Sequence, residues 1–199
     1  MTRSKPKTRA RLGIDLDEVV FRYFHTFRPF AAKELGRPEE DLRDPAFYSL
    51  VASGWFNEEE HYRQVHGNAV DAGLYRDLEV IEGASQNLWK LNDEGFTIHI
   101  ITSRFVNKGQ HGTVISQTGE SLDKNNIPFH SITFDGLKYE HNADVYLDDA
   151  PHNIETLRKE GKFVVIFDTT YNRHIEGLRV KSWEEFYQIV TDRFPATSE

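Results

Sequence analysis

The amino-acid sequence predicts an α/β fold in which helices cover both faces of a parallel sheet. Short apolar segments alternate with amphipathic helical segments after residue 83, and this alternation is typical of parallel sheets. The chain has 199 residues, of which 38% are hydrophobic, so it is long enough for one domain with an inserted subdomain. It contains no cysteine, which excludes a disulfide scaffold, a cysteine nucleophile and a thiolate metal site.

The first predicted strand covers residues 12–14, and the next strand signal begins only at residue 97. Between them the apolar residues recur at helical spacing, and those that share one predicted helix face are Phe21, Phe24, Phe27, Ala31 and Leu35. Turn signals interrupt this region. We therefore expect several short helices in an insert over residues 21–83. The insert follows the first strand of a core made of residues 11–20 and 84–193.

Strands and helices are expected to alternate regularly from residue 84 onward. The predicted helices cover residues 84–94, 112–125, 151–161 and 182–193. The predicted strands cover residues 97–101, 131–134, 145–147 and 163–167. Together they indicate a three-layer, Rossmann-like core, and sheets of this kind bind ligands at the carboxyl ends of their strands.

The net charge of −8 is distributed unevenly along the chain. Residues 1–11 contain five basic and no acidic side chains, so the remainder carries a charge of −13. An acidic body disfavours stable nucleic-acid binding, which needs a basic face, and we expect residues 1–10 to be a basic, disordered leader. No apolar run has the length of a membrane span or a signal peptide, so we expect a cytoplasmic protein.

Polar residues follow the predicted strands at the points where the strands end. The first strand leads into Asp15 and Asp17, the second into Thr102-Ser103, and the fourth into Asp148-Asp149, with Lys138 in the preceding loop. Like charges about 4 Å apart repel by about 4 kcal/mol at an effective dielectric constant of 20, so four converging carboxylates require a cation. Oxygen ligands without sulfur favour Mg²⁺.

These motifs, in this order, resemble those of the haloacid dehalogenase (HAD) superfamily phosphatases. The superfamily pattern is an Asp-x-Asp after the first strand, a Thr or Ser after the next, then a lysine, then an acidic pair. Within it the chain most resembles the 5'-nucleotidase, or 5'(3')-deoxyribonucleotidase, family of cytosolic type C. The passages similar to that family are 100–103, 145–153, 167–168 and 171–173. The helical insert over residues 21–83 also stands where that family has its cap, so the resemblance implies a small helical cap there. One departure is Glu18, where the family usually has glycine.

The resemblance implies a role for each motif residue. Asp15 is expected to attack phosphorus and form an aspartyl-phosphate, and Asp17 to act as general acid and base. Mg²⁺ is expected on the Asp15 carboxylate, the Asp17 backbone carbonyl and Asp148. Asp149 is expected to be an alternative ligand, a residue that orients the ligands, or a helix cap. The residues expected to donate to the substrate phosphate are Thr102, Ser103 and Lys138. Arg104 is expected either to join them or to balance the acidic edge.

The expected substrate is a small phosphate monoester, with a nucleoside monophosphate favoured by the resemblance. Aromatic residues expected either to stack on a nucleobase or to belong to the core are Phe21, Trp55, Phe56 and Tyr75. Three alternatives are another ester such as a sugar phosphate, a catalytically silent protein that binds a phosphate ligand, and a phosphatase of nucleic-acid ends that uses the basic leader. The resemblance also suggests a homodimer.

Overall fold

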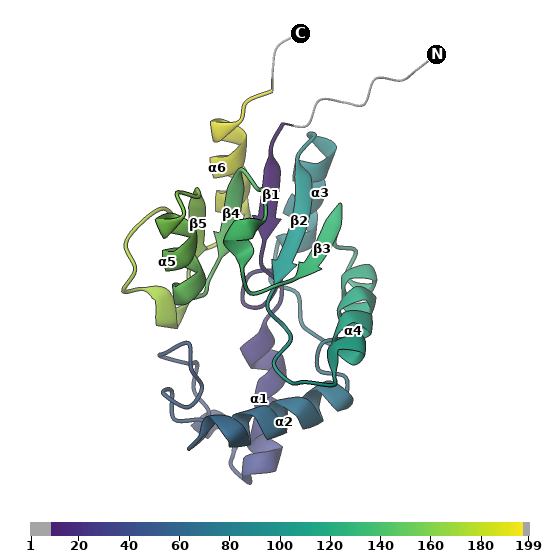
Figure 1. Cartoon of the computed structure of the whole chain (residues 1–199), viewed down its shortest axis with the longest axis vertical. Helices are drawn as coiled ribbons and strands as arrows, with labels where there is room; N and C mark the ends of the chain where they lie inside the picture. The colour runs from purple at the N-terminus through teal and green to yellow at the C-terminus, as the bar shows by residue number, and fades with distance from the viewer. Residues whose placement is uncertain (1–8, 197–199) are drawn as a thin grey trace.

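A six-stranded parallel sheet forms the centre of the molecule. The computed structural model describes residues 9–196 and places the strands in the order β3-β2-β1-β4-β5-β6 (Figure 1). The strands are β1 (Arg11–Ile14), β2 (Thr97–Thr102), β3 (Ser131–Phe134), β4 (Val145–Asp148), β5 (Val164–Phe167) and β6 (Arg179–Val180). The predicted α/β class with a parallel sheet is therefore confirmed. The two-residue strand β6 was not predicted, because so short a segment shows no periodicity.

The register of the three central strands determines which side chains meet at the carboxyl edge. Ile14 of β1 pairs with Ile100 of β2 on one side and with Leu147 of β4 on the other. The next residues along β1 and β4 are Asp15 and Asp148, so two carboxylates emerge side by side where the strands end. All four residues of β4 and of β5 are buried, as is usual for strands covered on both faces.

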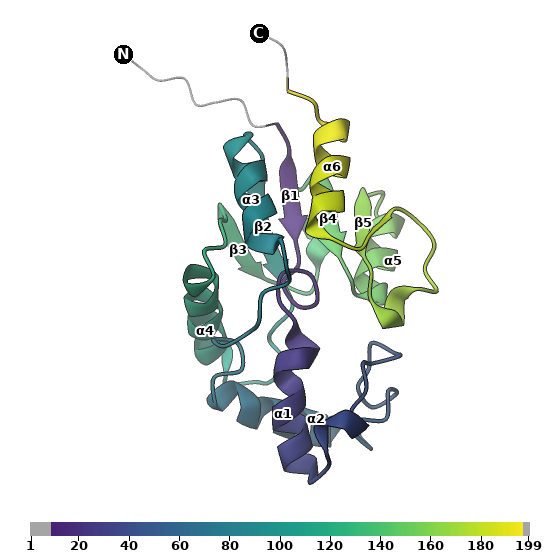
Figure 2. The same cartoon turned by 180° about the vertical axis from the view of Figure 1, so that it is seen from behind.

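Helices cover both faces of the sheet. Helices α3 (Ala84–Asp93) and α6 (Trp183–Arg193) lie together on one face, nearer the viewer in Figure 2. Helix α5 (Pro151–Lys159) lies on the opposite face, and α4 (His111–Lys124) lies beside β3 (Figure 1). The predicted capping box of α6 is partly confirmed, since the Ser182 hydroxyl accepts from the Glu185 backbone N–H. Within residues 9–196, no helix is long and apolar enough to cross a membrane.

The segment between β1 and α3 lies beyond the carboxyl ends of the strands (Figure 1). It contains α1 (Tyr23–Leu35), the 3-10 turn η1 (Glu39–Asp41) and α2 (Glu59–Asp71), so the prediction of short helices is confirmed. Phe21 does not lie on the α1 face predicted for it. It precedes the helix and forms isolated β-bridges with Asp17 and Val80, because the chain makes a tight turn after β1 before the helix begins.

One hydrophobic cluster continues from this helical segment into the sheet. It includes Phe27 and Val70 of the helices as well as Ile14 and Leu147 of the strands. The division into a cap and a core thus remains a prediction. The expected leader is outside the described residues for positions 1–8. Its last two positions belong to the folded part, since the Arg9 side chain bonds to Glu94 and to the Phe194 carbonyl.

Candidate active site

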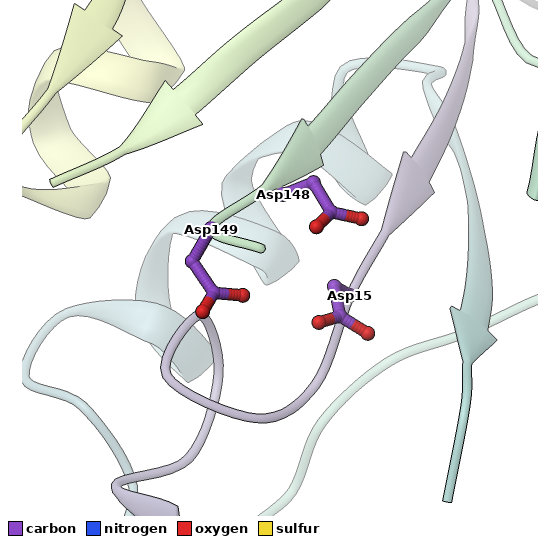
Figure 3. Close-up of side chains that lie close together, drawn as sticks. All are labelled: Asp15, Asp148 and Asp149. Carbon is purple, nitrogen blue, oxygen red and sulfur yellow. The ribbon is translucent and has the colours of Figure 1, made fainter. Parts of the chain in front are cut away.

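Three aspartates gather at the carboxyl edge of the sheet. Asp15 follows β1, while Asp148 ends β4 and Asp149 follows it, and their carboxylates point toward a common space (Figure 3). One oxygen from each lies within 4.8 Å of the others, and all three residues are buried. Because buried carboxylates repel each other strongly at this distance, the group requires neutralisation by positive charge.

Lys138 supplies part of that positive charge. It lies on the 3-10 turn η2 (Lys138–Glu140), and its Nζ is 2.7 Å from Asp15 Oδ1 and 2.7 Å from Asp148 Oδ2. Burial alone would lower the pKa of Lys138, but Asp148 and Asp15 outweigh it and raise that pKa. The lysine therefore stays charged. When all three carboxylates are ionised, they and the one ammonium leave two negative charges in excess.

A divalent cation fits that excess. The donors are all carboxylate oxygens, the ligand type that Mg²⁺ and similar hard cations prefer. Burial raises the pKa of Asp15 to about 6, with Lys138 opposing the effect and Asp148 adding to it. A cation between the three carboxylates would favour their charged forms. The residues that would hold it are Asp15, Asp148 and Asp149.

Neighbouring side chains fix the orientation of the acidic pair. Asp148 Oδ1 accepts from the Ala150 backbone N–H at 3.0 Å and from Asn153 Nδ2 at 3.2 Å. The Tyr171 hydroxyl donates to Asp149 Oδ2. Burial and the nearby Asp15 raise the pKa of Asp149. The alternative that Asp149 caps the following helix does not hold, because Ala150 occupies the cap position and no side chain caps it.

Asp17 lies apart from these three aspartates. Its two carboxylate oxygens accept from Arg104, at 3.0 Å from Nε and 2.6 Å from Nη2. The Arg104 side chain is fully buried and is not among the residues that line the neighbouring cavity. Arg104 Nη1 also donates to Thr118 Oγ1, so of the two roles expected for Arg104 these contacts favour the balancing of the acidic edge.

The hydroxyl groups after β2 differ in their availability. Thr102 Oγ1 is buried without a hydrogen-bond partner and lines the cavity beside Asp15. A buried hydroxyl without a partner is costly, so it is a site where a ligand oxygen would be stabilised. Ser103 also lines the cavity, and its Oγ donates to the Asp135 carbonyl at 3.1 Å.

Glu18 shows why glycine is usual at its position. Its φ is 56°, in the left-handed region that favours glycine. The side chain turns toward α1, where Oε1 accepts from the Phe24 backbone N–H at 2.8 Å and so satisfies one free donor of the helix start. Burial raises the pKa of Glu18 to about 7. The Glu18 carboxyl group therefore bonds to the start of α1 and is not part of the cluster of Asp15, Asp148 and Asp149.

The cavity at this edge has a volume of about 270 Å³ and two unlike walls. The charged residues after the strands form one wall. The other wall consists mainly of aromatic and polar residues of the inserted segment and the β5–β6 loop. Its members are Tyr23, Phe24, Tyr48, Ser49, Leu50, Glu59, Tyr62, Tyr75 and Tyr171. A tyrosine-lined surface offers both apolar ring faces and hydroxyl groups.

The four aromatic residues expected near a nucleobase are placed differently. Tyr75 lines the cavity, whereas Phe21, Trp55 and Phe56 do not and pack in the hydrophobic core. Trp55 even donates its indole N–H to the Arg43 carbonyl, away from the site. Tyr23, Tyr48 and Tyr62 also line the cavity and were not predicted to do so, because side-chain direction in short helices and turns depends on packing. It also missed Asn153, although an asparagine two residues after Pro151 is a signal at a helix start.

The fold is that of the HAD-superfamily hydrolases. A HAD-superfamily hydrolase of subfamily IA from Geobacter sulfurreducens has a TM-score of 0.56 at 14% identity, covering 90% of this chain and 95% of that one. The structure of a protein described as a "predicted phosphatase" from Clostridium acetobutylicum has a TM-score of 0.62 at 14% identity, covering 94% of this chain and 100% of that one. This fold, together with the match of the sequence to a nucleotidase family and to a relative at 36% identity, defines the class of protein as a phosphoric monoester hydrolase.

The family follows from comparison of sequences. The family "5' nucleotidase, deoxy (Pyrimidine), cytosolic type C protein" matches residues 9–194, and the chain belongs to it. A relative in Chlorobaculum tepidum described as "Putative 5'(3')-deoxyribonucleotidase" is 36% identical over 180 residues, 90% of this chain and 89% of that protein. The 5'(3')-deoxyribonucleotidase of Bacillus subtilis is 30% identical over 117 residues, 58% and 64% of the two chains. The resemblance noted in the sequence is thereby confirmed.

Proposed function

We propose that this protein is an Mg²⁺-dependent 5'-nucleotidase that hydrolyses nucleoside monophosphates, including deoxyribonucleotides, through an aspartyl-phosphate. The observation that carries the proposal is the convergence, in one cavity, of Asp15, the Lys138 ammonium and the unpartnered Thr102 hydroxyl. A nucleophile, a fixed cation and a free donor within one cavity are what phosphoryl transfer requires of a protein.

In the proposed mechanism, Asp15 attacks the phosphorus while Asp17 gives a proton to the leaving ester oxygen. Asp17 then takes a proton from water, which attacks the aspartyl-phosphate and releases inorganic phosphate. Dividing the reaction in this way replaces one difficult displacement by two easier ones. Both aspartates line the cavity, so both are within reach of a bound substrate.

The phosphate is proposed to bind between the hydroxyls after β2 and the lysine. Thr102, Ser103 and Lys138 all line the cavity and offer donors for the equatorial oxygens, where negative charge accumulates in the transition state. A divalent cation on Asp15, Asp148 and Asp149 would neutralise further charge on those oxygens. Arg104 is left out of this phosphate site.

The nucleoside is proposed to lie against the tyrosine-lined wall. Tyr62 and Tyr23 approach each other with their hydroxyls 3.4 Å apart, and Tyr75 lines the same wall. Ring faces hold bases without strong sequence preference, and hydroxyls add hydrogen bonds to sugar or base. The inserted segment 21–83 thus acts as the substrate-binding cap in this proposal.

The test is phosphate release from a panel of 5'- and 3'-ribonucleotides, deoxyribonucleotides and sugar phosphates, each measured with Mg²⁺ and with a chelator. We expect chelator-sensitive release that favours nucleoside monophosphates. Release from sugar phosphates alone would retain the chemistry and reject the nucleotide substrate. Absence of release from every ester would reject the catalytic proposal and favour a silent phosphate-binding protein.

A further inference from the structure

Arg104 is a buried charge in the loop after β2, and its partner is the aspartate outside the three-carboxylate cluster. Its side chain is 0% exposed, whereas that of Asp17 is 27% exposed and faces the cavity. An arginine is rarely buried in this way unless its charge is paired and its N–H groups are bonded. The structure meets both conditions through contacts on several elements.

The guanidinium holds Asp17 in a two-point grip. Nε and Nη2 donate to the two different oxygens of the Asp17 carboxylate, and Nη1 donates to Thr118 Oγ1 on α4 at 3.1 Å. Such bidentate pairs fix the plane of the carboxylate as well as its distance. Each carboxylate oxygen keeps a further lone pair, so Asp17 can still exchange a proton with a group in the cavity.

Two aromatic rings fix the guanidinium itself. The Arg104 Cζ lies 4.5 Å from the centre of the Tyr75 ring and 5.6 Å from that of Phe21. Tyr75 is anchored in turn, because its hydroxyl is 3.0 Å from His66 Nε2 and its backbone N–H donates to Gln117. Residues of the helical insertion and of the sheet domain therefore hold the same arginine.

The grip separates Asp17 from the other carboxylates. Among the described residues, the cluster able to hold a cation contains Asp15, Asp148 and Asp149 but not Asp17. We propose that Arg104 is a positioning residue that keeps the Asp17 side chain away from that cluster and oriented for proton transfer. This inference rests on the proposed function, in which Asp17 is the proton-transfer group.

The role concerns two proton transfers and no bond to Arg104. In the first, an oxygen of the Asp15 carboxylate forms a bond to phosphorus, the P–O ester bond breaks with its electron pair on the leaving oxygen, and Asp17 supplies the proton to that oxygen. In the second, water forms a bond to phosphorus, Asp17 takes its proton, and the bond to Asp15 breaks. A misplaced Asp17 slows both transfers. When the leaving group needs no proton, the rate of the attack by Asp15 is not affected.

The experiment compares a nucleoside monophosphate with p-nitrophenyl phosphate, whose leaving phenolate is stable without a proton. Single turnovers with enzyme in excess report the first step directly. We expect Arg104→Gln to slow that step on the order of 10²-fold for the nucleotide. It should leave release of p-nitrophenolate nearly unchanged. Arg104→Lys, which keeps the charge without the two-point grip, should fall between wild type and Arg104→Gln, and it replaces that variant if the glutamine is not tolerated.

The matched control is Arg9→Gln, which removes another largely buried arginine paired with a carboxylate, at the opposite end of β1. Its single-turnover rates should equal those of wild type. Equal losses on both substrates in Arg104→Gln would make Arg104 merely structural, and no loss on either would also overturn the proposal. Weaker inhibition by inorganic phosphate in proportion to the lost activity would make Arg104 a phosphate ligand instead.

Failure of the proposed function would have a different signature. Wild-type protein would then release no p-nitrophenolate, or Asp15→Asn would release it at the wild-type rate. Either result concerns the nucleophile and precedes any effect of Arg104, so the two failures are distinguishable.

Discussion

The two walls of the active-site cavity are built on different principles. On the sheet side each charged group is held by a partner of opposite charge or by a hydrogen bond, as Lys138 is by Asp15 and Asp148. The other wall consists mainly of tyrosines from the inserted segment, and we call it the cap wall. Its hydroxyls differ in their contacts, since those of Tyr23 and Tyr62 lie 3.4 Å apart whereas that of Tyr75 lies 3.0 Å from His66 Nε2. The sheet wall is thus held mainly by charge pairs, and the cap wall by ring packing and neutral hydrogen bonds.

In the proposed function, this difference separates the chemical step from the selection of the substrate. Preorganised charges lower the barrier of the chemical step because they need no rearrangement when charge develops. Ring faces and hydroxyls distinguish substrates through many contacts, each of which contributes little to the free energy of binding. Changes in the sheet wall should therefore abolish catalysis, and changes in the cap wall should alter which ester is hydrolysed.

The largest effect is expected for Asp15→Asn, which tests whether the sheet wall carries the chemistry. The amide cannot act as nucleophile, so phosphate release should fall by more than about 10⁴-fold. Phosphate release and circular dichroism measured together separate lost chemistry from lost fold. A folded variant with normal release would show that Asp15 is not the nucleophile.

Lys138→Ala should damage both rate and stability. It leaves Asp15 and Asp148 without their ammonium, and breaking such a buried pair costs about 3 to 5 kcal/mol. We expect kcat to fall more than KM rises, measured by steady-state kinetics alongside urea unfolding. In Lys90→Ala the lost partner is the exposed Glu184, so this control should cost less than about 1 kcal/mol. Equal costs for the two variants would contradict a preorganised sheet wall.

Glu18→Gln should change the pH dependence of stability at the boundary between the walls. The pKa of Glu18 is about 7 in the folded protein against an ordinary 4.5, so the folded state holds its proton more tightly. Wild type should therefore lose up to about 3 kcal/mol relative to the variant as pH rises from 4.5 to 7.

This difference is measured by urea unfolding of both proteins at several pH values with chelator present. Other titrating groups are common to the two proteins and cancel. The amide oxygen of glutamine can still accept from the Phe24 backbone N–H, so the helix start is preserved. A stability difference that is constant across this pH range would show that folding does not raise the pKa of Glu18.

The smallest effect is expected for Tyr62→Phe, which removes one hydroxyl from the cap wall and keeps the ring. A neutral hydrogen bond contributes about 0.5 to 1.5 kcal/mol, so KM for nucleotides should rise by at most about tenfold. Acetyl phosphate has no base or sugar to contact the cap wall, so its hydrolysis is the control and should be unchanged in this variant. Loss of both activities together would remove the distinction between the walls.

Sequence reasoning worked well where topology dictates position. Parallel strands end at one edge, so Asp15, Thr102 and Asp148 were expected to converge from their places after apolar segments, and the register of β1 with β2 and β4 brings them there. It left two roles open for Arg104, because a partner 87 residues distant along the chain leaves no local signal. It also left two roles open for Trp55 and Phe56, since aromatic residues serve equally well as core and as lining, and the structure packs both in the core.

The sequence by itself determined the α/β class, the place of the helical insertion and which polar groups follow the strands, because periodicity and strand order are encoded locally. Tertiary structure decided which of those groups share a partner. Lys138 joins Asp15 and Asp148, while Arg104 takes Asp17 away from them, although all the carboxylates follow similar strands. The physical reason is that the field at a buried charge depends on side chains brought together from distant segments, and only the folded chain sets those distances.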